Sequence, residues 1–156
     1  MKSSENSERM NMAKWQTILL CSSNASAVDK LRALKSTPDG ELMRVIEYQI
    51  PETKLMSNQE ADELYPKLYT NYGHAGRIYI RDLVENLEER ILEIKQIQRM
   101  IDEKVGFTNR ERFWSGTAAC NIAGALFAKR LGIHDIDVGR VFKWMLQQFA
   151  QMRTEI

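Results

Sequence analysis

The chain has 156 residues, a hydrophobic fraction of 44% and a formal net charge of +1. This size fits one domain, or a core fragment with a helical extension, and the composition excludes a chain that is disordered throughout. Because the net charge is close to zero, any contact with nucleic acid or a membrane would have to come from a local patch.

Further features of the sequence limit the kinds of protein that this chain can be. These features are its cysteines, its histidines and its apolar runs. Cys21 and Cys120 have apolar or small neighbours and are predicted to be buried free thiols in a reducing compartment. No C-x-x-C pair accompanies the two histidines, so no metal site is expected. The polar first twelve residues lack the apolar core of a signal peptide, and no apolar run is long enough to span a bilayer. We therefore expect a cytoplasmic protein with no membrane contact.

Residues 1–14 are polar, show no periodicity, and are expected to form an N-terminal arm. One interpretation is a frayed terminus. The other is a loop in which Lys2, Arg9 and Lys14 contact phosphates, because they are the local basic excess in this region. On the second interpretation these three cations are candidate nucleic-acid-binding residues.

Two apolar segments, residues 15–21 and 45–50, are predicted to be strands. The first ends in the small polar residues 22–24, and the second ends at Pro51, which cannot continue a ladder. Strands that are apolar on both faces belong in a parallel sheet covered by helices, and ligands bind at the carboxyl ends of such strands. Two strands make an incomplete sheet. Residues 15–56 are therefore either part of a larger α/β core or a small domain that its helices complete.

The remainder of the chain, residues 57–156, is predicted to be helical. Ser57 begins a capping box at the first of these helices. Residues 77–104 carry apolar side chains at helical spacing, in one long helix or in two helices joined near Asn86. A segment rich in small residues, 110–131, should pack closely on several sides and form the centre of a bundle. The expected fold is an α/β fragment that is mostly α.

The motifs of a self-sufficient nucleotide hydrolase are missing from the sequence. It contains no G-x-x-x-x-G-K-[ST] loop to hold phosphates, and no apolar run ends in the paired acidic residues that bind Mg²⁺. The hydrolase motifs H-E-x-x-H and G-x-S-x-G are missing as well. The chain alone is therefore not expected to hydrolyse ATP.

Four residues would nevertheless suit a nucleotide site. Asn24, beside Ser23, could orient an attacking water or touch a terminal phosphate, or it could be a turn residue that caps the next helix. Arg44 could act as an arginine finger on the nucleotide of an adjacent subunit, or it could pair on the surface with a neighbouring glutamate. Arg77, at the start of a helix, is compatible with a nearby phosphate or an acidic partner, for which Asp82 of the same chain is the simpler candidate. Asn24 and Arg44 are the candidate catalytic residues, and Ser23, Asn24 and Arg77 the candidate nucleotide-binding residues.

Six short blocks follow one another along the chain: Glu5-Asn6 to Arg9-x-Asn11, TILLCSSN at 17–24, KLRALKSTPDGELMRVIEY at 30–48, NYGHAG at 71–76, RERFW at 110–114 and AKRLG at 128–132. Their order and spacing resemble the C-terminal half of bacteriophage helicase-like ATPases, relatives of the AAA+ and superfamily 3 helicases that occur with phage primases. The resemblance covers nearly the whole chain. The regions that carry the Walker A and Walker B motifs have no counterpart in it.

The resemblance implies specific roles. Asn24 would be a sensor residue that reads the terminal phosphate, and Arg44 a finger that acts across a subunit interface. Residues 2–14 would end a loop that faces nucleic acid, and residues 57–156 would form a helical lid and C-terminal bundle. ATP and Mg²⁺ would bind only in combination with a complementary chain. The implied partners are an N-terminal ATPase half or adjacent subunit, further copies in a homo-oligomeric ring, and single-stranded DNA.

Three hypotheses about function follow. In the leading one the chain is the C-terminal segment of a phage DNA helicase or primase-associated ATPase, split or truncated, that acts in DNA replication in the cytoplasm of a bacterial host. In the second it is a non-catalytic helical module that binds DNA or a replication protein. In the third it is a small protein with an unrelated bundle fold.

Overall fold

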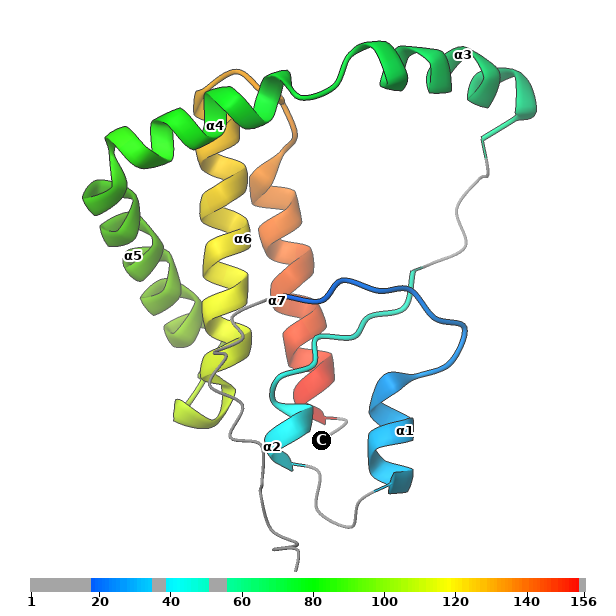
Figure 1. Cartoon of the computed structure of the whole chain (residues 1–156). Coiled ribbons are helices and arrows are strands. Elements are labelled where there is room, and N and C mark those ends of the chain that lie inside the picture. Colours follow the sequence, from blue (N-terminus) through cyan, green and yellow to red (C-terminus); the bar gives the residue numbers. More distant parts are fainter. Residues whose placement is uncertain (1–17, 35–38, 51–55, 155–156) are drawn as a thin grey trace, which may run out of the picture.

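The computed structural model describes residues 18–34, 39–50 and 56–154, and the regular structure in these ranges is helical (Figure 1). In chain order the elements are α1 (Ala27–Leu34), α2 (Asp39–Leu42), α3 (Asn58–Thr70), α4 (His74–Glu85), α5 (Leu87–Val105), the short 3₁₀ helix η1 (Asn109–Glu111), α6 (Arg112–Arg130) and α7 (Val138–Thr154).

The predicted strands and parallel sheet are wrong for the described residues. Residues 18–21 and 45–50 run as extended segments (Figure 1) but form no strand within the described ranges, and residues 15–17 lie outside them. The second segment packs on the helical bundle instead. The indole of Trp114 donates a hydrogen bond of 2.9 Å to the Val45 carbonyl oxygen, and the Tyr48 ring meets Trp144 edge-on. The part of the prediction that holds is the mostly helical character of the chain.

Helices α5, α6 and α7 pack against one another as a three-helix bundle, with α6 in contact with both neighbours (Figure 1). The buried residues of α6 are mainly small: Trp114, Ser115, Ala118, Ala119, Ile122, Ala123 and Phe127. Small side chains allow the neighbouring helices to approach closely, and larger residues such as Ile101 and Phe149 fill the space between them. The prediction that this segment forms the centre of the bundle is confirmed.

An aromatic cluster closes the end of the bundle where α6 begins. Trp114 and Phe149 stack with their ring centroids 6.2 Å apart, and Phe107 meets Phe149 edge-on at 5.4 Å. Trp114 is fully buried, whereas its neighbour Phe113 is 42% exposed.

The two cysteines are exposed free thiols, so the prediction that both are buried is wrong. Cys21 belongs to the extended segment before α1, in which Ile18, Leu19 and Leu20 are exposed as well. Cys120 lies on the part of the α6 surface that α5 and α7 leave uncovered.

The helix ends follow local side-chain chemistry. Ser57 and Glu60 form the expected capping box at α3, and Thr108 forms a second capping box at η1. Gly106 ends α5 with φ of 68°, a left-handed conformation that glycine adopts without steric cost. These ends determine where the chain turns between the bundle helices.

Helices α4 and α5 meet at Asn86, so the alternative of two helices is the one found. The corner is held by Arg90, whose guanidinium donates two hydrogen bonds of 2.9 Å to the Asp82 carboxylate and stacks over the Phe127 ring of α6. These hydrogen bonds hold the pKa of Asp82 below its usual range. The contact joins α4, α5 and α6 at one place.

Helix α3 projects away from the bundle, and α4 continues from it across the other end of α6 (Figure 1). None of the α3 residues is buried. Pro66 lies inside the helix, which continues to Thr70 beyond it. The bundle therefore provides no core for α3.

Candidate functional site

The N-terminus of α1 holds the carboxylate of Glu47, which comes from the extended segment after α2. The Glu47 Oε2 atom accepts hydrogen bonds of 2.8 Å from the Ala27 amide and 3.1 Å from the Val28 amide. Burial opposes ionisation, but these bonds and one from the Ser26 hydroxyl lower the pKa of Glu47 overall. A helix N-terminus is where a phosphate would bind, and here a carboxylate of the same chain takes that place.

Ser23 and Asn24 lie in the bend before α1 and are exposed. The Ser23 hydroxyl accepts a hydrogen bond of 3.2 Å from the Ala25 amide. Ser26 caps α1, since its hydroxyl accepts a bond of 3.0 Å from the Asp29 amide. Asn24 makes no hydrogen bond within the described ranges, so its side-chain amide faces solvent.

Arg44 is exposed and lies against the beginning of α6. Its guanidinium sits 5.3 Å from the centroid of the Phe113 ring, and the guanidinium of Arg112 sits 5.1 Å from the same centroid. The buried neighbours Leu42 and Met43 anchor this segment. Two cations are therefore held at one half-exposed aromatic ring by cation–π contacts.

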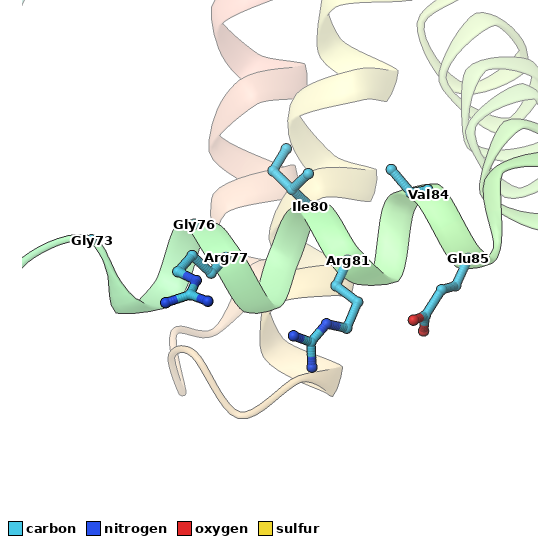
Figure 2. Close-up of a pocket in the computed structure, with 7 residues that line it drawn as sticks. All are labelled: Gly73, Gly76, Arg77, Ile80, Arg81, Val84 and Glu85. Atoms are coloured by element: carbon cyan, nitrogen blue, oxygen red, sulfur yellow. The ribbon is translucent and has the colours of Figure 1, made fainter.

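Arg77 lies on α4, in an open hollow of about 630 Å³ (Figure 2). The hollow is lined by Gly73, Gly76, Arg77, Ile80, Arg81, Val84 and Glu85. Figure 2 shows Ile80 and Val84 on one side of the helix and the charged side chains on the other. Arg77 and Arg81 make no ion pair with any residue that the structure describes.

The structure does not bring the predicted site residues together into one site. Within the described ranges, no hydrogen bond or ion pair joins Ser23, Asn24, Arg44 and Arg77 to one another. Arg44 contacts Phe113 at the start of α6, whereas α4, which carries Arg77, contacts α6 near Gly124. These positions on α6 are roughly 16 Å apart along the helix axis. Lys2, Arg9 and Lys14 lie outside the described residues.

Two features of these surfaces were not predicted from the sequence. Arg81 follows Arg77 by four residues, the spacing that places both on one helix face, and this signal was available. Glu47 at the α1 N-terminus could not be foreseen, because the contact joins residues about twenty positions apart through an irregular segment.

The exposed groups on these surfaces are suited to binding. Among the described residues there is no group of three or more His, Cys, Asp or Glu side chains that could hold a metal ion. No helix in those ranges has the length and apolar character needed to cross a membrane. The exposed arginines and apolar side chains suit recognition of another macromolecule.

Comparisons with protein-family models, with curated proteins and with solved structures give no match to this chain.

Proposed function

We propose that the chain is a non-catalytic segment of a helicase-type replication ATPase, and that it acts only when bound to the polypeptide that carries the phosphate-binding loop. The assignment to helicase-type ATPases is supported by the six sequence blocks described above. The dependence on a second polypeptide comes from the missing Walker motifs and from an uncovered apolar surface near α1.

That apolar surface is the observation that carries the proposal. Ile18, Leu19 and Leu20 are 85%, 85% and 93% exposed, and Ile50 in the other extended segment is 70% exposed. Burying each such side chain gains roughly 1.5–3 kcal/mol, and contiguous exposed apolar patches mark interaction sites. A docked ATPase core would cover these residues and leave the polar bend at Ser23 and Asn24 beside the partner's nucleotide.

In this complex ATP and Mg²⁺ belong to the partner's loops. Asn24 would face the terminal phosphate, and Arg44, held against the bundle by Phe113, would reach the nucleotide of an adjacent subunit. Single-stranded DNA would contact Lys2, Arg9 and Lys14. A replication role of this kind places the protein in the cytoplasm of a bacterial host.

Co-expression with a candidate partner, identified as a neighbouring reading frame that encodes G-x-x-x-x-G-K-[ST], tests the proposal. Leu20→Asp should abolish co-purification, whereas the control Leu34→Asp, which alters a residue of α1 that is 80% exposed, should retain it. In the intact complex, Arg44→Ala should lower ATP turnover by about 10³-fold or more without weakening assembly. Turnover by the purified chain alone, lost in Asn24→Ala, would overturn the proposal, as would unchanged co-purification of Leu20→Asp.

A second candidate function is direct binding of nucleic acid at Phe113. Two guanidinium groups flank this half-exposed ring, and arginines interleaved with aromatic rings bind single strands through phosphates and stacking. Fluorescence anisotropy with labelled single-stranded DNA should then show salt-dependent binding that Arg112→Ala weakens. Absence of binding at low salt would exclude this function.

A further inference from the structure

Helix α3 is an amphipathic helix with no buried residue. Leu64, Tyr65, Leu68 and Tyr69 recur on it at helical spacing and are 37%, 56%, 54% and 77% exposed, and Tyr72, just after the helix, is 76% exposed. The helix has 13 residues, and isolated helices of about this length are marginal in water even with good caps. A surface that covers these side chains would therefore stabilise α3.

The open hollow on α4 has a lining that suits contact with a second helix. Gly73 and Gly76 have no atom within 4 Å of the position that a Cβ would take, so a second backbone can approach closely there. Ile80 and Val84 continue this strip and are 57% and 73% exposed (Figure 2). The strip is thus apolar and open along the length of α4.

The charges beside the two surfaces are complementary. Helix α3 carries three acidic residues against the single basic residue Lys67. Glu60 is engaged in the capping box, which leaves Asp62 and Glu63 exposed on the helix. The α4 hollow carries Arg77 and Arg81, with Glu85 at its far end. An acidic amphipathic helix such as α3 therefore matches the hollow in both apolar pattern and charge.

We propose that α3 of one copy docks in the α4 hollow of a second copy, and that the exchange is reciprocal. The same chain carries the helix and the hollow, and within one chain α3 runs away from α4 (Figure 1). A two-fold axis between two α3–α4 units lays each α3 along the other copy's α4, which forms an isologous dimer. This interface is separate from the apolar segment around Leu20 and doesn't depend on the proposed function.

Analytical ultracentrifugation of the full chain over a wide concentration range tests the dimer. The wild-type chain should dimerise, and Leu68→Asp should raise the dimer dissociation constant by at least about tenfold. Leu92→Asp is the matched control, since Leu92 lies on α5 and is 60% exposed against 54% for Leu68. Circular dichroism should show that both variants keep the folded bundle. A wild-type monomer at every concentration, or an equal effect of both substitutions, would overturn the proposal.

Exchanging the charges of α3 and of the α4 hollow tests whether each copy docks its α3 in the hollow of the other. One variant carries Asp62→Lys with Glu63→Lys, and the other carries Arg77→Glu with Arg81→Glu. Each should be monomeric alone because like charges meet, whereas an equimolar mixture should form heterodimers in which both contacts pair opposite charges. If the mixture stays monomeric, or if the arginine variant keeps the dimer and loses only single-stranded DNA binding, the hollow is not a dimer interface. Neither result affects the co-purification test of the proposed function.

Discussion

The hydroxyl oxygen of Tyr79 on α4 lies 3.0 Å from the position that a Cβ atom would occupy at Gly124 on α6. Glycine inside a helix costs about 1 kcal/mol relative to alanine, so Gly124→Ala would stabilise α6 if space allowed. The tyrosine hydroxyl would have to move by a few tenths of an ångström to admit the methyl group, which offsets this gain. We expect Gly124→Ala to give little or no gain in the wild-type chain, and a gain of about 1 kcal/mol in a Tyr79→Phe background. Urea denaturation of the four proteins in a double-mutant cycle measures the coupling. Additive effects of the two substitutions on the free energy of unfolding would contradict this coupling.

The hydrogen bond from Trp114 to the Val45 carbonyl predicts a large effect of Trp114→Phe. The substitution leaves a cavity and an unpaired carbonyl, which together should lower the free energy of unfolding by about 2 kcal/mol. Hydrogen exchange of residues 42–48 should accelerate in the same variant. Trp144→Phe is the control, because Trp144 is 42% exposed and phenylalanine keeps an aromatic edge toward Tyr48. Equal effects of the two substitutions would show that the hydrogen bond is not the cause.

The ionisation of Glu111 should make the free energy of unfolding depend on pH in the acid range. Burial opposes its ionisation, but the Thr108 hydroxyl at 2.6 Å, the Thr108 amide at 2.9 Å and then Arg153 lower the pKa of Glu111. A carboxyl whose folded pKa lies below the unfolded value of about 4.3 stabilises the fold above that pH, and the contribution is lost as pH falls through the folded pKa. Glu111→Gln should therefore be less stable than wild type at neutral pH, with the difference shrinking below about pH 4. Urea denaturation over a pH series measures this, and parallel curves would contradict it.

Arg90 should matter far more for stability than an arginine in a surface pair. Its side chain is 12% exposed and binds Asp82, whereas Arg32 pairs with Asp29 at 3.6 Å with side chains 39% and 76% exposed. Arg90→Met leaves Asp82 without its cation and should lower the melting temperature clearly. Arg32→Met should leave it almost unchanged, because exposed pairs contribute little. Differential scanning calorimetry measures the melting temperature of both variants. Equal decreases would show that Arg90 has no special role at the corner between α4 and α5.

The helical part of the fold was predictable because its signals are local. Ser57, Thr108 and Gly106 satisfy the free backbone groups at helix ends with atoms only a few residues away. The small residues of α6 predict close packing, whichever helices lie beside it. These features depend little on the rest of the chain, so the sequence alone was sufficient to place them.

The strands were not predictable, because an apolar run does not say what will cover it. Ile18, Leu19 and Leu20 have the pattern of a buried strand, but the described chain supplies no neighbouring strand and leaves them exposed. The contacts of the predicted site residues were not predictable for a related reason. Arg44 meets Phe113 through a tertiary contact between residues far apart in the sequence, which no local pattern encodes.

The bond between Trp114 and Val45 joins residues 69 positions apart, whereas α5, α6 and α7 contact their neighbours in the chain. Local contacts form quickly, so the bundle should assemble first and the 42–48 segment should dock on it last. During synthesis at about 5–20 residues per second, that segment must wait for Trp144, roughly 100 residues later, for on the order of 5–20 s. The 42–48 segment therefore leaves the ribosome before the bundle helices but finds its place after they have packed, and in that interval it is open to chaperones.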